Sequence, residues 1–244
     1  MHSLSTLLGL AGLAAIPLVS AHGYVSNIVA NGQSYPAVND PVWYYSSTKP
    51  QKAGWFALNQ DIGFVPPNSY GTSDIACHKS ATAGTTEIPV TAGSTVTVTW
   101  NTWPGDSHKG CVRRPLSSSL PSTLTLPANK SRPQNSPIID ALAKCSGSCT
   151  SAKAADLSFF KIAQQGLTAS TQKWATDTLM SNGLKWNIKI PSTLAAGSYV
   201  LRHEIIALHG AGSQNGAQNY PQVCRSQDGR ARRSWLMSFC SAST

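Results

Sequence analysis

Alternating apolar and polar residues predict several β-strands in this chain. The segment STVTVTW (94–100) alternates Val96, Val98 and Trp100 with threonines, which is the period-two pattern of a half-buried strand. LKWNIKIP (184–191) alternates in the same way, and a turn at 92–94 connects the first strand to TTEIPV (85–90). AAGSYVLRHEIIALH (195–209) follows another glycine turn and is predicted to be a long central strand.

Helices are expected to be short and few. SPIIDALAKC (136–145) and the region around KWATDTLMSNG (173–183) are the two predicted helical stretches. Segment 33–75 has weak periodicity and many Tyr, Trp, Pro and Gly residues, so it is interpreted as a long surface loop of the kind that carries binding residues. Strands joined at short spacing favour a mostly β fold, an immunoglobulin-like or fibronectin-like antiparallel β-sandwich with long loops and short helices.

Two segments do not share this patterning. Segment 111–134 is polar, rich in proline and without periodicity, and segment 223–244 shows no alternation. We interpret them as an atypical insertion and an atypical tail of one domain that covers residues 22–244, with no separate carbohydrate-binding module.

The first 21 residues have the features of a secretory signal peptide. Residues 1–21 contain no acidic or basic side chain other than His2, and an apolar run ends in the small-residue pattern Val19-Ser20-Ala21. The run is short for a membrane span. Cleavage after Ala21 would make His22 the first residue and would free its α-amino group. We therefore expect a secreted, extracellular protein without a membrane anchor.

Composition and charge narrow the class further. Only 12% of the residues are charged, and the six cysteines suit an oxidising compartment. The net charge of +9 lies mostly in segments 111–134 and 221–244, without an aromatic and basic motif for nucleic acid. We therefore expect no nucleic-acid partner.

Two histidines are candidate metal ligands. An N-terminal His22 carries two nitrogen donors, the amine and ring Nδ1, which together can chelate one metal ion. His108 follows a predicted strand in the polar turn WPGDSHKG and offers a third nitrogen. Nitrogen donors in a planar arrangement suit Cu(II), although either histidine alone is compatible with an ordinary surface position. For His78 and His203 we predict structural roles, with Glu204 as a candidate partner of His203.

Several long motifs, in the right order, resemble the copper-dependent lytic polysaccharide monooxygenases of auxiliary activity family 9, formerly glycoside hydrolase family 61. They are HGYVSNIVANGQSY, GWFALNQDIGFVPPNSYGTSDIACHK, TAGSTVTVTWNTWPGDSHKG, PIIDALAKCSGSC, LSFFKIAQQGL and YVLRHEIIALHGAGSQNGAQNYPQ. The resemblance covers residues 22 to about 222, except 111–134.

The resemblance implies one copper ion per chain, held by a histidine brace. His22 would contribute its amine and Nδ1, and His108 its Nε2. Tyr220 matches the family's axial tyrosine, and His209 and Gln218 match the pair that hydrogen-bonds oxygen species at the metal.

It also implies oxidative cleavage of β-1,4-glucan, such as cellulose, at C1 and/or C4 of a glucose unit. O2 or H2O2 would be the oxidant, and a small reductant or cellobiose dehydrogenase would be the electron donor. Because aromatic rings stack on sugar faces, Tyr24, Tyr44 and Tyr45 are candidate substrate-binding residues. We expect the enzyme to work as a monomer.

The chain departs from the family pattern in two places. The family continues from HKG directly into the segment equivalent to SPIIDALAKC, so we interpret 111–134 as an in-frame retained intron; it carries a glycosylation acceptor at Asn129. The cysteine that follows NYPQ in the family is displaced by one residue, to Cys224, and the family's final strand is expected to be missing.

Cysteine pairing is chosen by the resemblance, because four cysteines alone allow three connectivities. It implies the disulfides Cys145–Cys149 and Cys77–Cys224, and it leaves Cys111 and Cys240 free.

Two other functional classes remain open from the residues alone. A hydrolase, such as an endoglucanase, needs two carboxylates flanking the scissile bond, and no such pair is evident. A non-catalytic or inactive cellulose-binding protein would not need His22 at the terminus. A zinc site is disfavoured, because no third His, Cys or carboxylate ligand is apparent.

Overall fold

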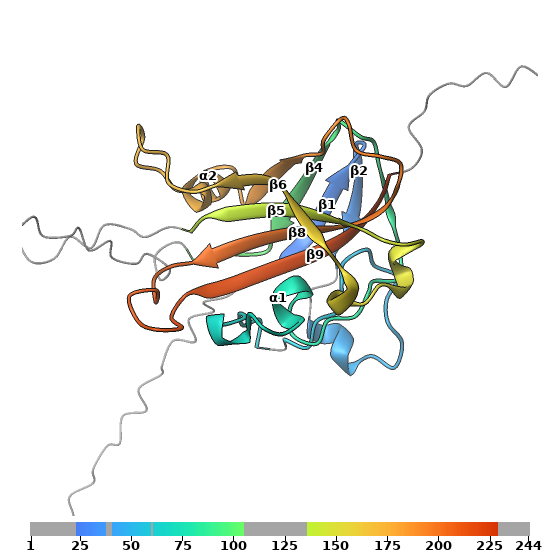
Figure 1. Cartoon of the computed structure of the whole chain (residues 1–244), viewed down its shortest axis with the longest axis horizontal. Coiled ribbons are helices and arrows are strands. Elements are labelled where there is room, and N and C mark those ends of the chain that lie inside the picture. The colour runs from blue at the N-terminus through green and yellow to red at the C-terminus, as the bar shows by residue number, and fades with distance from the viewer. Residues whose placement is uncertain (1–22, 38–40, 60, 105–135, 229–244) are drawn as a thin grey trace, which may run out of the picture.

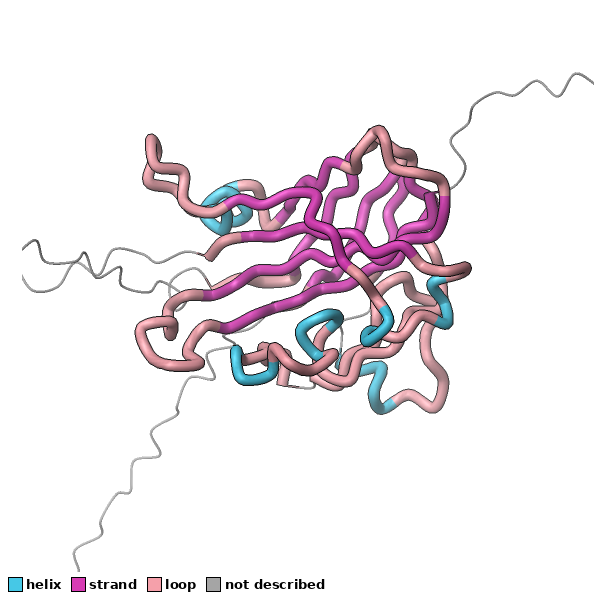
Figure 2. The backbone as a smooth tube through the Cα atoms, viewed as in Figure 1, coloured by secondary structure: helices cyan, strands magenta, loops and turns pink. Residues whose placement is uncertain are grey.

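The computed structural model describes residues 23–37, 41–59, 61–104 and 136–228, and these form two β-sheets packed face to face (Figures 1 and 2). A four-stranded sheet has the order β2-β1-β4-β7, and a five-stranded sheet has the order β3-β9-β8-β5-β6. Every pairing is antiparallel except that of β3 with β9. The predicted β-sandwich is confirmed.

The first sheet consists of β1 (Val25–Ala30), β2 (Gln33–Pro36), β4 (Thr95–Trp100) and β7 (Lys185–Lys189). The second consists of β3 (Ile88–Val90), β5 (Ile138–Lys144), β6 (Phe159–Gln165), β8 (Gly197–Ala207) and β9 (Gln218–Asp228). The helices are α1 (Asp74–Cys77) and α2 (Ala175–Ser181), with the 3-10 turns η1 (Pro41–Tyr45), η2 (Pro67–Ser69), η3 (Cys149–Ser151) and η4 (Ala154–Asp156).

Alternation along β4, β7 and β8 places one face of each strand in the core between the sheets. Val96, Val98 and Trp100 of β4 are buried, and the threonines between them are more exposed. β8 lies at the centre of its sheet, as predicted, and α2 is the predicted helix at 173–183. The core also contains Ile28, Ile138, Leu142, Ile188, Leu201, Ile205 and Tyr220.

A buried polar network joins the two sheets through this core. Trp100 Nε1 of β4 donates to His203 Nε2 of β8 at 3.0 Å, and His203 Nδ1 donates to Asp140 Oδ1 of β5 at 2.7 Å. Trp186 Nε1 of β7 completes the network by donating to Asp140 Oδ2 at 3.0 Å. Each polar atom of this network thus has a partner, as burial requires. His203 is structural, as predicted, but its partner is Asp140 and not Glu204.

The predicted helix at 136–145 is wrong, because residues Ile138–Lys144 form strand β5. β5 lies between β6 and β8, and six of its seven side chains are buried or half-buried. A strand buried on both faces loses its alternation, so Ala and Leu residues at close spacing imitate a helix. Pairing with two neighbours outweighs the local helix propensity.

Segment 33–75 is not only a surface loop. It begins with β2 and contains η1 and η2, and Trp55, Phe56 and Val65 are almost completely buried. Trp55 N donates to Val223 O of β9, so this segment covers the outer face of the five-stranded sheet. It forms part of a second, smaller apolar cluster on that face.

The strand expected to be missing after Tyr220 is present. β9 continues to Asp228, and its backbone pairs with β8 along its whole length and with β3 over Ser226–Asp228. The sequence here shows no apolar alternation because polar residues occupy inward positions, among them Gln222, whose Oε1 accepts from Val25 N at 3.1 Å.

The expected disulfide Cys77–Cys224 is wrong, because Cys77 is a buried free cysteine. Its β9 neighbour in the outer apolar cluster is Val223, whereas the backbone of Cys224 pairs with Leu201, a residue of the inner core. Side chains alternate between faces along a strand. A displacement of one residue therefore moves the cysteine away from the face on which Cys77 lies.

Returning the cysteine to position 223 should restore the bond. In the double variant Val223→Cys, Cys224→Ser, we expect a disulfide between Cys77 and the introduced cysteine that raises the free energy of unfolding by about 2 kcal/mol. Thiol titration under denaturing conditions, with thermal unfolding before and after reduction, checks this. A variant that keeps two more reactive thiols than the disulfide predicts would contradict the proposed geometry.

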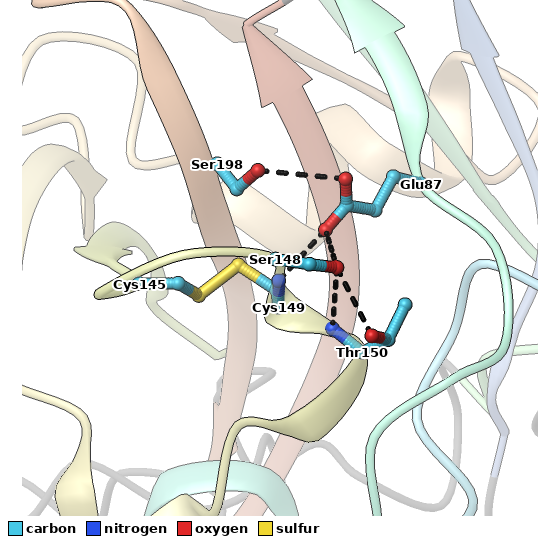
Figure 3. The surroundings of a disulfide bond; sticks show 6 residues. All are labelled: Glu87, Cys145, Ser148, Cys149, Thr150 and Ser198. Atoms are coloured by element: carbon cyan, nitrogen blue, oxygen red, sulfur yellow. Dashed lines mark hydrogen bonds between the residues drawn. A yellow bond between two sulfur atoms is a disulfide. The ribbon is translucent and has the colours of Figure 1, made fainter.

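The Cys145–Cys149 disulfide is present, as expected. Glu87 anchors the loop that it closes (Figure 3): its Oε1 accepts from Cys149 N at 2.7 Å and from Ser148 Oγ at 3.0 Å, and its Oε2 accepts from Ser198 Oγ at 3.4 Å. One carboxylate therefore ties the disulfide loop to β8.

Several predicted features lie outside the described residues: the signal segment 1–21, His22, His108, Cys111, Asn129, Cys240 and the body of the 111–134 insertion. Among the described residues, no helix is both long and apolar enough to cross a membrane.

Candidate functional site

The candidate site lies at one end of the sandwich, where β1 begins and β4 ends. Val25 pairs with Trp100, and beyond this pair Asn101 N donates to Tyr24 O at 2.9 Å while Tyr24 N donates to Asn101 Oδ1 at 2.8 Å. His22 comes two residues before Tyr24, and His108 comes a few residues after Trp103. Both histidines are outside the described residues, but the strands that adjoin them lie side by side.

Gly23 fixes how closely the start of β1 approaches the end of β4. A Cβ atom at this position would lie 2.0 Å from the carbonyl oxygen of Thr102. Only glycine permits this contact without a shift of the backbone. The residue directly after His22 is therefore held against the segment that leads towards His108.

Tyr220 is completely buried behind these segments. Its ring packs edge-on against Trp103, with centroids 5.3 Å apart, and tilted against Phe64 at 6.1 Å. Its hydroxyl donates to Gln218 Oε1 at 2.8 Å. Burial, assisted by the charge of Asp61, raises the pKa of Tyr220 well above its usual value, so the phenol stays neutral.

Gln218 and His209 lie at the two ends of the connection between β8 and β9, the loop at the left of Figure 1. Gln218 pairs with Ala207, and His209 follows two residues later, half-buried. Gly210 and Gly216 close this connection: a Cβ on Gly216 would lie 1.7 Å from the carbonyl oxygen of Gly210. The structure thus brings Gln218 and Tyr220 into contact and places His209 in the adjoining loop.

Asn219 and Tyr70 are site residues that the sequence interpretation missed. Asn219 Nδ2 donates to Val65 O at 3.1 Å and to the Tyr70 hydroxyl at 2.8 Å, and Asn219 is buried. Tyr70 is 49% exposed, so it presents an aromatic ring to solvent beside the start of β9. Its proline- and glycine-rich loop gave no periodic signal, and only the pairing of Val65 with Asn219 places it here.

The three predicted substrate-binding tyrosines lie in different surroundings. Tyr24 is half-buried beside Asn101 at the site, whereas Tyr45 is 81% exposed in η1. Tyr44 packs edge-on against Trp43 and Tyr45 rather than against a site residue. In Figure 1, η1 lies at the lower edge to the right, away from the β8–β9 connection.

His78 has a structural role beneath the loop that carries Phe64 and Tyr70. Its ring is buried, Nε2 donates to Gly63 O at 2.9 Å, and Nδ1 accepts from Lys79 N at 2.8 Å. These bonds satisfy a neutral imidazole. Burial, together with the positive charge of Lys79, lowers the pKa of His78 to about 4 against the hydrogen bond to Gly63 and nearby carboxylates.

Acid should therefore weaken the fold through His78. An unfolded histidine titrates near 6.5, so the stability that the neutral ring contributes is complete above that pH and is lost as pH falls towards 4. We expect about 2 kcal/mol of loss between pH 7 and pH 4.5 from this residue. Urea unfolding of the wild type and of His78→Gln at both pH values measures it; an equal pH dependence in both proteins would contradict this assignment.

Comparisons with known proteins agree with this arrangement. The model of Auxiliary Activity family 9 (formerly GH61) matches residues 22–123 and 116–226, and the division between the two matches falls within the 111–134 segment. AA9 family lytic polysaccharide monooxygenase F of Emericella nidulans is 44% identical over 223 residues, which cover 91% of this chain and 79% of that protein. The enzyme of the same name from Malbranchea cinnamomea is 46% identical over 90% of this chain and 76% of its own length.

Solved structures show the same fold. Cel61B of Hypocrea jecorina, a glycoside hydrolase family 61 member, superposes with a TM-score of 0.70 at 36% identity, over 84% of this chain and 80% of that one. The extended catalytic domain of H. jecorina LPMO9A gives a TM-score of 0.68 at 40% identity, over 84% and 73%. These matches, with the buried tyrosine–glutamine pair at the meeting point of β1 and β4, show that the chain belongs to auxiliary activity family 9 and is a lytic polysaccharide monooxygenase.

Proposed function

We propose that this chain is a secreted copper enzyme that cleaves β-1,4-glucan, such as cellulose, oxidatively at C1 and/or C4. The observation that carries the proposal is the convergence of the segments adjoining His22 and His108 on the Tyr220–Gln218 pair. The resemblance assigns copper ligands to these histidines, and the fold supports it, because Gly23 and Thr102 are in direct contact.

The residues that would hold the copper ion are His22, through its amine and Nδ1, and His108, through Nε2, with Tyr220 on the axial side. Nitrogen donors of this kind suit copper. When bound, copper supplies one-electron chemistry that activates O2 or H2O2. The described neighbours fit such a site, since they exclude water and present a neutral phenol rather than a competing charge.

Gln218 and His209 would position and protonate an oxygen species. Because Gln218 Oε1 accepts from the Tyr220 hydroxyl, its amide nitrogen is the group oriented to donate a hydrogen bond elsewhere. His209 carries an imidazole that can hold or release a proton near neutral pH. Tyr220 thus acts chiefly by fixing the orientation of Gln218.

Substrate and electron donor follow from the same resemblance. Tyr24, Tyr44 and Tyr45 would stack on the sugar rings of a polysaccharide surface. Electrons would come from a small reductant or from cellobiose dehydrogenase. Segment 1–21 supports export through the secretory pathway, and residues 22–244 would act as one monomeric catalytic domain, with glycosylation at Asn129.

Copper titration of the protein processed to His22, followed by electron paramagnetic resonance, tests this proposal. We expect one Cu(II) per chain with an axial, nitrogen-rich signal. Mass spectrometry of soluble products from cellulose should then show oxidised chain ends with a reductant present. Plain reducing ends would indicate a hydrolase, and cellulose binding without products would indicate a non-catalytic binding protein.

A further inference from the structure

A pocket of about 400 Å³ lies beside the candidate site, outside the group of residues that the proposed function uses. This volume falls within the range of small-ligand sites, which combine mostly apolar walls with a few polar groups. All of its lining comes from one stretch of the chain, residues 61–79, which contains η2 and α1. The lining residues are Asp61, Gly63, Phe64, Val65, Pro66, Ser69, Asp74 and Lys79.

The apolar wall of the pocket is shared with the candidate site. Phe64 packs against Tyr220 at 6.1 Å between ring centroids, and Val65 exchanges backbone hydrogen bonds with Asn219. Pro66 continues the wall towards η2. A ligand in this pocket would therefore lie against the same segment that supports Tyr220 and the exposed Tyr70.

The polar groups of the pocket offer more acceptors than donors. Asp61 Oδ1 accepts from Gly63 N at 3.0 Å and Oδ2 lies 3.5 Å from Lys79 Nζ, while Asp74 Oδ1 accepts from Ser80 N at 2.9 Å. Carboxylate oxygens accept more than one hydrogen bond each, so both acids retain capacity. Two carboxylates against one ammonium make the pocket net negative, which disfavours anionic ligands.

The backbone around the pocket is held in an unusual conformation. Ile62 has φ of 53° and His78 has φ of 78°, both in the left-handed region that β-branched and bulky residues rarely adopt. The hydrogen bond from His78 Nε2 to Gly63 O connects the two positions at 2.9 Å. The pocket is therefore pre-formed rather than created by a ligand, which lowers the entropic cost of binding.

We propose that this pocket binds one neutral pyranose unit, as an accessory carbohydrate subsite next to the catalytic end; this rests on the proposed action on polysaccharide. A pyranose presents an apolar C–H face that fits Phe64 and Pro66. Its hydroxyl groups donate to Asp61 and Asp74, and one hydroxyl oxygen accepts from Lys79. Such a subsite would hold a side-chain sugar or a neighbouring strand beside the chain that is being cleaved.

Amide chemical shifts of the metal-free, ¹⁵N-labelled protein during titration with cellobiose test the subsite. We expect saturable shifts in residues 61–79 of the wild type. Asp61→Ala should weaken the apparent Kd at least fivefold, and the charge-matched control Asp156→Ala, in the exposed turn η4, should change it less than twofold. Asp61 has a side chain that is 67% exposed, so its removal should leave the fold intact.

Three other outcomes would overturn the proposal. They are that cellobiose shifts no resonance in 61–79, that Asp61→Ala and Asp156→Ala behave alike, or that catechol binds while cellobiose does not; each result rejects a sugar subsite. Because the protein is metal-free, the result is independent of the copper titration. Sugar binding without copper binding would leave the subsite and reject the proposed function, and the reverse would reject only the subsite.

Discussion

Replacing Arg202 with methionine is expected to lower the free energy of unfolding by about 3–5 kcal/mol, the cost of leaving one partner of a buried ion pair alone. Arg202 Nη1 donates to Glu204 Oε2 at 2.9 Å and Nη2 lies 2.8 Å from Oε1; the two side chains are 12% and 5% exposed. The same guanidinium donates through Nε and Nη2 to the carbonyl oxygens of Ile75 and Ala76 in α1. It therefore joins α1 and its loop to the outer face of β8.

The pH dependence of the loss identifies its cause. Burial raises the pKa of Glu204, and the charge and hydrogen bonds of Arg202 act against that rise. Without Arg202 the carboxyl should remain protonated to a higher pH, so the variant loses more stability at pH 7 than at pH 4. Urea unfolding at both pH values measures this, with Lys153→Met on the surface as the control.

A second variant guards against an unrelated packing defect. Arg202→Met combined with Glu204→Gln removes the buried charge, and it should recover part of the stability at pH 7. If the single variant lost less than about 1 kcal/mol, or if Glu204→Gln gave no recovery at all, the ion pair would not be the feature that holds α1.

Strands buried on one face were predictable from the sequence, and those with two buried faces or polar inward positions were not. β4, β7 and β8 show their alternation directly. β5 does not, since Asp140 occupies a core position where His203 and Trp186 satisfy it. The inward polar residues of β9 are likewise explained only by partners from distant parts of the chain, such as Val25 for Gln222.

The candidate site divides in the same way. Gln218 and Tyr220 were reached through a family motif, and the structure shows their hydrogen bond. Tyr70 and Phe64 were not reached, because their loop is placed by contacts with Asn219 and Tyr220 that have no local signature. The error at Cys224 is different: the displaced cysteine was visible, but its consequence required the register of β9 against β8.

Leaving one alanine before His22 should abolish copper-dependent oxidation while cellulose binding persists. The extension converts the terminal amine into an amide, so one of three nitrogen donors is lost. Gly23 is packed against Thr102, and Tyr24 and Asn101 exchange two hydrogen bonds, so the start of the chain has no freedom to move another donor into place. Because even indirect changes around a metal ligand cost 10–100-fold in affinity, we expect copper affinity to fall by about 100-fold or more.

Isothermal titration with Cu(II) measures the affinity, and mass spectrometry of products from cellulose measures oxidation. The matched control carries the same alanine after Thr244, where it should change neither quantity. Proteolytic removal of the N-terminal alanine should restore both, which separates loss of the amine from damage to the fold. A protein with the extension that bound copper within threefold of the processed form and still released oxidised chain ends would show that the terminal amine is not a ligand. The function proposed here would then need a different metal site, since the described residues contain no cluster of three His, Cys, Asp or Glu side chains that could hold a metal ion instead.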